Sequence, residues 1–371
     1  MKLFLRNLLL FFLSSLATLA LFETGFQIAN FPKTEGLTEI WMVPHRLYHH
    51  FHKPNISFFN EVDEEKVTRK QKVVFNADGL RDRPTTEGLP KILFIGDSFV
   101  QGSQVDVDEL FGNKVEDKLK NIDVINVGCS SWSSILYYNW LKENLSKVKD
   151  LKSVYLFFFS NDPNDTLKYW KKADEPKDLE HITFTGYVDK NDLDDTSFRF
   201  WLYKHSKIYF LIYRAKERIK ERINKFRNVN SVNESDTFLN FFRGFATLEQ
   251  KEAVALDNAY LVKISQLLAR NQIKFSVVYI PIAQQIGLDE NEIGSQYYGE
   301  ELKEVISRST IFQDNLKTLA SENSFDFIDL TPSLRNYKKE HPQPHLYNNR
   351  DAHFNAVGHQ AVAEVMANYI K

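Results

Sequence analysis

Two short stretches of this 371-residue chain carry side chains that could act together in covalent catalysis. The tripeptide 96–98, Gly-Asp-Ser, directly follows the apolar run 91–95, and the tripeptide 351–353, Asp-Ala-His, lies near the carboxyl end. Serine alone is a weak nucleophile, and it is usually activated by a histidine that a carboxylate orients. Ser98 and His353 therefore predict nucleophilic attack on an acyl carbon, provided that folding brings them together.

The elements around these stretches predict an α/β fold. Five short apolar runs are expected to form strands, at 91–95, 123–127, 153–159, 274–280 and 325–330. Helical patterns lie between and after them, at 108–120, 134–148, 248–270, 301–323 and 356–369. Strands that alternate with helices indicate a mostly parallel sheet with helices on both faces. Ser98 then leaves the first strand at the carboxyl edge of the sheet, where such sheets bind their ligands.

The composition is that of an ordinary globular protein and narrows the classes of function. Hydrophobic residues make up 43% of the chain and charged residues 26%, and the formal net charge is -2, so no basic excess indicates a nucleic-acid partner. The single cysteine, Cys129, excludes an intramolecular disulfide and a cysteine-based metal cluster, and is expected to be a small buried residue. We expect neither a metal nor a cofactor.

The order of four stretches, 96–98, 126–133, 160–162 and 351–353, resembles that of the SGNH hydrolases, also called the GDSL esterase/lipase family. The octapeptide 75–82, FNADGLRD, is similar to one that precedes the nucleophile in the membrane-anchored bacterial branch of that family. The resemblance implies a flavodoxin-like three-layer α/β/α sandwich with a mostly parallel five-stranded sheet. It also implies transfer or hydrolysis of acyl groups through a serine.

The resemblance implies a role for each of five residues. Ser98 is the nucleophile, and its backbone N–H helps to hold the oxyanion of the intermediate. His353 is the base, and Asp351 orients its imidazole. Asn161 would donate its side-chain amide to the oxyanion, where one such donor contributes on the order of 3 kcal/mol. Ser131 would supply a further backbone N–H.

Two positions depart from the family pattern. The family usually has a glycine where this chain has Ser131, so the N–H there serves only if the backbone suits a residue with a Cβ. Asp351 precedes His353 by two positions, with one residue between them where the commoner spacing has two. Either Asp351 completes the triad or the site is a dyad. Asp162 is expected to cap a turn by accepting hydrogen bonds from backbone amides.

The amino-terminal segment predicts attachment to a membrane. Lys2 and Arg6 precede an apolar run at 8–22, which Glu23 ends. We expect residues 1–29 to be an uncleaved signal-anchor and the alternative, a cleaved signal peptide, remains open. The positive residues at the start favour a cytoplasmic amino terminus and an exported body, periplasmic or extracellular.

Residues 30–371 are expected to form the hydrolase domain, with a helical insertion at about 166–247. Within the insertion, 204–227 has nine Lys or Arg and two Glu. A solvated helix face is the first interpretation, and a lid that contacts anionic lipid or polysaccharide is the second. Four histidines within 45–52 match no metal-site spacing, and we expect them at the surface.

Three functions remain open at this point. The first is an exported, membrane-tethered serine esterase that hydrolyses O-acyl esters, in particular O-acetyl esters, of a cell-surface carbohydrate. The second is an O-acyltransferase, which would use the same triad to transfer the acyl group to a sugar hydroxyl. The third is a degenerate binding module without activity, for which the missing glycine at Ser131 is the main argument.

Overall fold

The computed structural model describes residues 2–32, 41–64, 67–185, 198–230, 240–291, 300–349 and 351–370. The chain divides into two compact units. Residues 41–187 and 235–371 form the larger one, here called the sheet unit, and residues 1–40 and 188–234 form the helical unit. The expected insertion is thus shared between them, and its stretches 186–197 and 231–239 lie outside the described residues.

A parallel five-stranded sheet is the centre of the sheet unit. Its strands are β5 (Lys91–Gly96), β6 (Asp123–Gly128), β7 (Leu151–Phe158), β8 (Lys274–Tyr279) and β9 (Asp326–Asp329). They lie in the order β6-β5-β7-β8-β9, and every neighbouring pair runs parallel. The strands are apolar runs because helices cover both faces of the sheet. This is the flavodoxin-like order, so the predicted fold class is confirmed.

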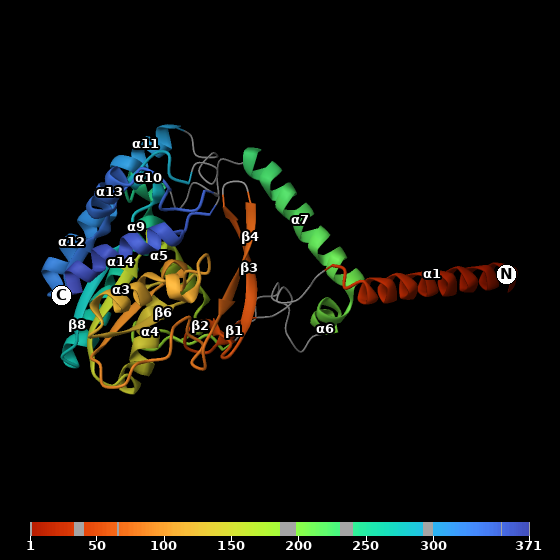
Figure 1. The fold of residues 1–371 in the computed structure, drawn as a ribbon, viewed down its shortest axis with the longest axis horizontal. Helices are drawn as coiled ribbons and strands as arrows, with labels where there is room; N and C mark the ends of the chain where they lie inside the picture. Colours follow the sequence, from red (N-terminus) through yellow and green to blue (C-terminus); the bar gives the residue numbers. More distant parts are fainter. Residues whose placement is uncertain are drawn as a thin grey trace. The chain divides into compact units, whose positions relative to one another are not determined.

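The helices form two layers, as the sheet order requires (Figure 1). Right-handed crossovers that move toward opposite edges of a parallel sheet place their helices on opposite faces. One layer contains α3 (Phe111–Leu119), α13 (Leu330–Glu340) and α14 (Ala356–Ile370), and α14 contacts both of the others. The other layer is built around α9 (Leu248–Arg270), which contacts α4 (Ser134–Asn144), α5 (Asp162–Lys172) and α12 (Ile311–Asn323).

Shorter helices complete the described part of the sheet unit. They are α2 (Ser98–Gln101), α10 (Ala283–Ile286) and α11 (Glu300–Arg308), with 3-10 turns at Val107–Glu109, Leu145–Lys147 and Asn240–Arg243. The pattern at 301–323 was expected to be one helix and is two, α11 and α12, because Ser309 and Thr310 interrupt it.

Two antiparallel hairpins precede the sheet, and none of the five strands expected from the sequence lies in this region. β1 (Met42–His45) pairs with β2 (His49–His52), and β3 (Ser57–Glu64) pairs with β4 (Val67–Val74). The expectation that the histidines of this region are exposed is wrong for three of them: His49, His50 and His52 are buried. They are covered because β2 packs against aromatic rings, with His52 stacked on Phe75 at 4.0 Å between ring centroids.

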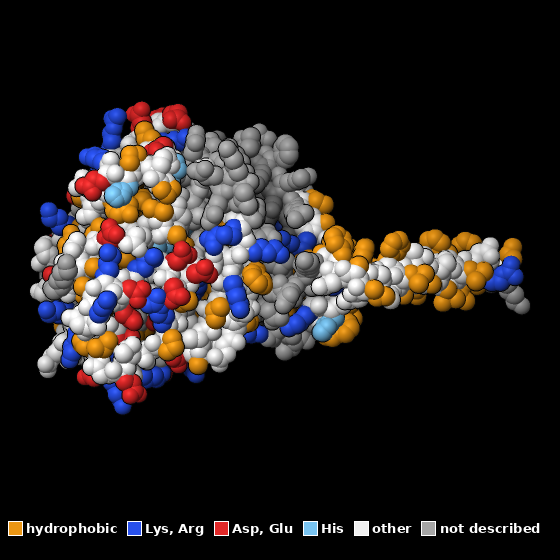
Figure 2. Space-filling model, viewed as in Figure 1, with side chains coloured by type: hydrophobic (Ala, Val, Ile, Leu, Met, Phe, Trp, Pro, Cys, Tyr) orange, Lys and Arg blue, Asp and Glu red, His pale blue; other side chains and the backbone are white. Residues whose placement is uncertain are grey.

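The helical unit contains α1 (Lys2–Ile28), α6 (Phe198–His205) and α7 (Lys207–Asn230). Over Leu3–Ile28, α1 is long and apolar enough to cross a membrane, with mean hydropathy 1.8 and none of that stretch buried in the protein. Its hydrophobic side chains are on the surface in Figure 2. A signal sequence at an amino terminus has the same length and composition.

Candidate active site

The proposed nucleophile stands at the turn between β5 and α2. Ser98 is the first residue of α2, and Asp97 caps that helix by accepting a hydrogen bond from the N–H of Phe99 at 2.9 Å. β5 lies between β6 and β7, so Ser98 is at the point where the strand order reverses and where sheets of this kind bind ligands. Ser98 is half-buried, so part of the residue is exposed at this edge of the sheet.

The structure brings Ser98, His353 and Asp351 together. The Nε2 of His353 is 2.7 Å from the Ser98 hydroxyl across 255 positions of sequence. The other ring nitrogen, Nδ1, is hydrogen-bonded to Oδ1 of Asp351. With the proton of the neutral ring on Nδ1 and donated to Asp351, Nε2 is left to accept the proton of the serine hydroxyl.

A loop closed by hydrogen bonds allows Asp351 to contact the ring of His353 although only one residue separates them. The N–H of Asn348 donates to the carbonyl of His353 at 2.9 Å, and Tyr347 pairs with Phe354 as an antiparallel bridge. Oδ2 of Asp351 accepts a hydrogen bond from Nε2 of Gln104 at 2.7 Å. Both oxygens of the carboxylate are therefore held, one by the imidazole and one by an amide.

The electrostatics of the site favour a charged imidazole. Burial alone would lower the pKa of His353, but the hydrogen bond and charge of Asp351, with the charge of Asp97, raise it above the ordinary value. Burial would raise the pKa of Asp351, but His353 and Gln104 hold it below its ordinary value. Burial raises the pKa of Asp97 to about 6. A carboxylate paired in this way stabilises the imidazolium that forms when His353 takes a proton.

Three candidate oxyanion donors lie on different loops at the carboxyl edge. Within the described parts of the chain, no acceptor takes a hydrogen bond from the backbone N–H of Ser98 or of Ser131. Ser131 has φ +61°, the left-handed conformation that glycine adopts without strain, so the backbone here has this shape although the residue carries a Cβ. Asn161 donates one amide hydrogen to Asp165 at 2.9 Å, which orients its side chain and leaves a second hydrogen.

Residues that sequence reasoning missed hold the loop of Ser131. The Oε1 of Gln101 accepts hydrogen bonds from the N–H and the hydroxyl of Ser130, at 2.7 and 2.9 Å. Nε2 of His52 is 3.2 Å from the same Oε1, and Nε2 of His50 is 2.8 Å from the carbonyl of Ser130. Burial lowers the pKa of both histidines to about 4, so they are neutral hydrogen-bonding groups. Nothing in the local sequence pattern of 45–52 indicates this role.

The octapeptide 75–82 supplies Arg81, which holds the carboxyl end of α2, the helix that begins with Ser98. Arg81 is completely buried, and its guanidinium donates to the carbonyls of Gln101 (2.9 Å), Gly102 and Val105, which end and follow α2. The last carbonyls of so short a helix lack partners within it, and Arg81 donates to the carbonyl of Gln101 and to those of the turn that follows, where the N–H of Val105 also donates to Gly102 at 3.2 Å. The octapeptide includes Arg81, but the contacts of this side chain appear only in the fold. A buried arginine without a hydrogen-bonded acid needs several carbonyl oxygens around its guanidinium.

Close packing requires a glycine at position 128, in the stretch 126–133. A Cβ on Gly128 would lie 2.1 Å from the backbone nitrogen of Gln101 and 2.4 Å from the backbone carbon of Val100. The end of β6 therefore touches the backbone of α2, and only a residue without a side chain fits between them. This contact explains why the chain has a glycine at 128 in addition to the left-handed residue at 131.

Two other expectations can be compared with the structure. The expectation that Asp162 accepts hydrogen bonds from backbone amides is wrong: its side chain is fully buried, and within the described residues neither carboxyl oxygen has a partner. Burial, and then the charges of Asp97 and Asp257, raise the pKa of Asp162 well above its ordinary value, which favours the neutral form. Cys129 is buried as expected, and burial raises the pKa of its thiol.

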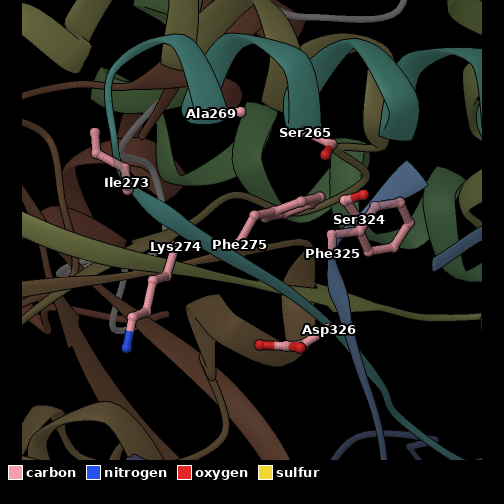
Figure 3. Close-up of a pocket in the computed structure, with 8 residues that line it drawn as sticks. All are labelled: Ser265, Ala269, Ile273, Lys274, Phe275, Ser324, Phe325 and Asp326. Carbon is pink, nitrogen blue, oxygen red and sulfur yellow. The ribbon is translucent and has the colours of Figure 1, made fainter. Parts of the chain in front are cut away.

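Within the described residues, no group of His, Cys, Asp and Glu has the arrangement of a metal site. Figure 3 shows a shallow pocket that includes Lys274 and Asp326, the first residues of β8 and β9. This pocket therefore lies at the amino edge of the parallel sheet, away from the carboxyl edge that carries Ser98. The candidate catalytic side chains and this pocket thus lie at opposite ends of the strands.

Comparisons with known proteins give matches among solved structures only. No family model and no curated protein sequence matches the chain. An acetyl xylan esterase matches with 16% identity and TM-score 0.39, over 76% of this chain and 100% of that one. An esterase from Pseudoalteromonas sp. matches with 11% identity and TM-score 0.39, over 76% and 96%. A member of the lipolytic protein G-D-S-L family from Veillonella parvula matches with 14% identity and TM-score 0.36, over 74% and 94%. The chain is thus similar, at low identity, to esterases and to a member of the family whose motif order it resembles.

Proposed function

We propose that this chain is a serine esterase with Ser98 as its nucleophile, His353 as its general base and Asp351 as the orienting acid. The observation that carries the proposal is the 2.7 Å separation between the Ser98 hydroxyl and Nε2 of His353, with Asp351 on the opposite ring nitrogen. A base must lie within hydrogen-bond reach of the proton that it removes, and Nε2 of His353 does so.

The proposed reaction has two halves. Oγ of Ser98 forms a bond to the carbonyl carbon of the ester, and its proton moves to Nε2 of His353. The tetrahedral intermediate then breaks the bond to the alcohol, which leaves with the proton from Nε2. Water, deprotonated by the same nitrogen, attacks the acyl carbon of the acyl-serine. The bond from that carbon to Oγ of Ser98 then breaks, Oγ takes the proton back from Nε2, and the carboxylic acid leaves. The N–H groups of Ser98 and Ser131 and the amide of Asn161 are the proposed donors to the oxyanion of both intermediates.

The proposed substrate is an O-acyl ester, in particular an O-acetyl ester, of a carbohydrate at the cell surface. The resemblance to SGNH hydrolases supports the acyl chemistry, and the proposed export of the sheet unit supports a surface substrate. Two aromatic side chains form a wall beside the base. The ring centroid of Phe99 is 4.8 Å from that of His353 and 4.5 Å from that of Phe159. We propose that this wall limits the acyl group to a short chain.

Labelling by a fluorophosphonate tests the nucleophile. The native chain is expected to take up one label per molecule on Ser98, and Ser98→Ala and His353→Ala are expected to take up none, because the serine must be deprotonated to react. Ser321→Ala, which removes an exposed hydroxyl from α12, serves as the matched control and should label normally. A native chain that does not label would favour the binding module.

Acetate release separates hydrolysis from transfer. With a simple acetyl ester as donor, the proposed esterase releases one acetate per alcohol, and adding an acetyl-free oligosaccharide leaves that ratio unchanged. Acetylated oligosaccharide formed at the expense of acetate would contradict the esterase and favour the acyltransferase. A series of esters with longer acyl chains tests the proposed aromatic wall, and the rate is expected to fall as the chain lengthens.

A further inference from the structure

The helical unit joins the apolar helix to the basic helix through one carboxylate. Glu23 of α1 accepts hydrogen bonds from the hydroxyl of Ser206 at 2.9 Å and from the backbone N–H groups of Lys207 and Ile208 at 2.8 and 3.0 Å. Nε2 of Gln27, one turn further along α1, donates to the carbonyl of His205 at 2.8 Å. The N–H groups at the start of a helix attract an anion, so α7 stabilises the charge of Glu23.

This junction sets the depth of α7 relative to a membrane that α1 would cross. α1 has 27 residues, and at about 1.5 Å per residue it is about 40 Å long, more than the hydrocarbon thickness of about 30 Å. Arg6 stands near one end of its apolar run, and Glu23 is the first acidic residue at the other. In a membrane crossed by the apolar run that Glu23 ends, the carboxylate and the helix start bound to it would lie at the level of the lipid headgroups.

α6 shows two aromatic faces of different kinds at this level. On one face, Phe200 and Tyr203 are buried and pack with Phe210 of α7. On the other, Phe198 is 71% exposed and Trp201 is 53% exposed, and their rings stack at 5.8 Å. The second pair lies outside the aromatic cluster that packs α6 on α7. Exposed tryptophan and phenylalanine beside the end of an apolar helix are typical of the membrane–water interface.

The first half of α7 carries exposed apolar side chains beside exposed basic ones. Ile212 and Ile219 are 62% and 58% exposed, and residues seven apart lie on one face of a helix. Lys216 and Lys220 are exposed beside that face. An apolar face bordered by cations is the pattern of helices that lie on anionic lipid.

We propose that α6 and the first half of α7 form a membrane contact surface, here defined by Phe198, Trp201, Ile212, Lys216, Ile219 and Lys220. The surface lies in the headgroup layer of the membrane that α1 crosses, with its apolar side chains at the boundary of the acyl chains and its lysines on lipid phosphates. The proposal rests on the insertion of α1. Continuity with α1 through Glu23 selects a lipid partner over a protein or a polysaccharide.

Quenching of tryptophan fluorescence by brominated lipid tests the aromatic part of the surface. The full chain is reconstituted into phosphatidylcholine vesicles whose acyl chains carry bromine either near the headgroup or near the terminal methyl. We expect stronger quenching by the shallow bromine. Trp201→Phe should remove most of that quenching, because the other four of the five tryptophans lie in the sheet unit. Trp170→Phe is the matched control and should leave it unchanged.

The charge part of the surface is tested in the same vesicles with and without phosphatidylglycerol. Anionic lipid is expected to increase the shallow quenching of Trp201, and the double variant Lys216→Glu/Lys220→Glu is expected to abolish that increase. Lys251→Glu, an exposed lysine on α9, reverses one charge outside the surface and should keep the increase.

Distinct results would overturn the surface, its anchor or the proposed function. Equal quenching of the native chain and Trp201→Phe would overturn the surface, and would favour burial of Trp201 against protein. Release of the chain from the vesicles by alkaline carbonate would overturn the insertion of α1 and the surface with it. Hydrolysis of an acetyl ester, measured in the same vesicles, tests the proposed esterase separately, and Trp201→Phe should leave its rate unchanged.

Discussion

At the scale of single residues, three side chains at the carboxyl edge form one hydrogen-bonded chain from Ser98 through His353 to Asp351. Gln104 extends this chain by holding the second oxygen of the carboxylate. Each member fixes the next, so the loss of one leaves the others without a function. This dependence is the basis of the first prediction.

Ser98→Ala and His353→Ala are each expected to lower kcat by on the order of 10⁴-fold or more, and the double variant should be barely slower than either. The reason is that serine and histidine act in one proton transfer, which is already lost when either is removed. Steady-state hydrolysis of an acetyl ester measures all three variants. Losses that multiply in the double variant would contradict the assignment of a shared step.

The raised pKa of His353 predicts the acid side of the pH profile. Only the neutral imidazole can accept the serine proton, so kcat/KM falls as the pH drops through that pKa. Because Asp351 raises the pKa, the midpoint is expected above the ordinary value of histidine. In Asp351→Asn the midpoint should move to lower pH, and kcat should fall by about 10⁴-fold because the imidazole loses its orientation. A midpoint that stays in place would assign the titration to another group.

Asn161 is predicted to act on the oxyanion alone. Asn161→Ala should lower kcat by roughly 10² to 10³-fold with little change in KM, because the donor contacts charge that develops only in the transition state. Asn164→Ala, another amide in the same loop and helix, is the matched control. If KM rises and kcat is unchanged in Asn161→Ala, the amide binds the ground state instead.

At the scale of elements, the site is made by loops that follow the carboxyl ends of β5, β6 and β7 and by the loop before α14. The β1–β2 hairpin supports the second of these loops through His50, and α2 supports it through Gln101, since both side chains form hydrogen bonds with Ser130. A parallel sheet brings these strand ends to one edge, but each loop is given its shape by contacts from elsewhere in the chain. Ser131 is the residue whose backbone shows this most directly.

Ser131→Gly is expected to keep full activity and to raise stability by up to about 1 kcal/mol, because glycine adopts positive φ without the steric cost that a Cβ brings. Ser131→Ala keeps the N–H and the Cβ, and should match the native chain in both respects. Thermal unfolding and ester hydrolysis measure the two effects. A large loss of activity in Ser131→Ala would show that the hydroxyl, not the backbone, has the role.

At the scale of the whole molecule, the chain combines a sheet unit that carries the candidate site with a helical unit that begins with α1. α1 exposes nearly all of its large apolar side chains, which water disfavours and a bilayer accepts. The attachment of the protein to a membrane and the side on which the sheet unit lies remain predictions.

The full chain is expected to sediment with membranes and to resist extraction by alkaline carbonate, and deletion of residues 1–30 should release it. Amino-terminal sequencing of the sedimented protein distinguishes an anchor, which keeps Met1 or Lys2, from a cleaved signal. A new terminus near Leu21 in a soluble protein would support the signal peptide. Deletion also removes Glu23, so ester hydrolysis by the released form serves as the control for folding.

The amino-acid sequence by itself determined the strands, the class of fold and the residue types of the site. Runs such as 91–95 and 274–280 are mostly apolar, without a regular alternation of polar residues, because a parallel sheet buries both faces, so their secondary structure can be read locally. The motifs around Ser98, Asn161 and His353 indicated acyl chemistry through their order. Their proposed roles and the domain boundaries at 1–29 and 30–371 stay predictions.

Only the tertiary structure decided which side chains meet and what surrounds them. The approach of His353 to Ser98 spans 255 positions, and no local pattern reports it. Burial of His50 and His52, the positive φ of Ser131 and the unpartnered carboxyl of Asp162 likewise depend on distant packing. Local sequence sets backbone preference and polarity, whereas burial and hydrogen-bond partners come from segments that are adjacent only after folding.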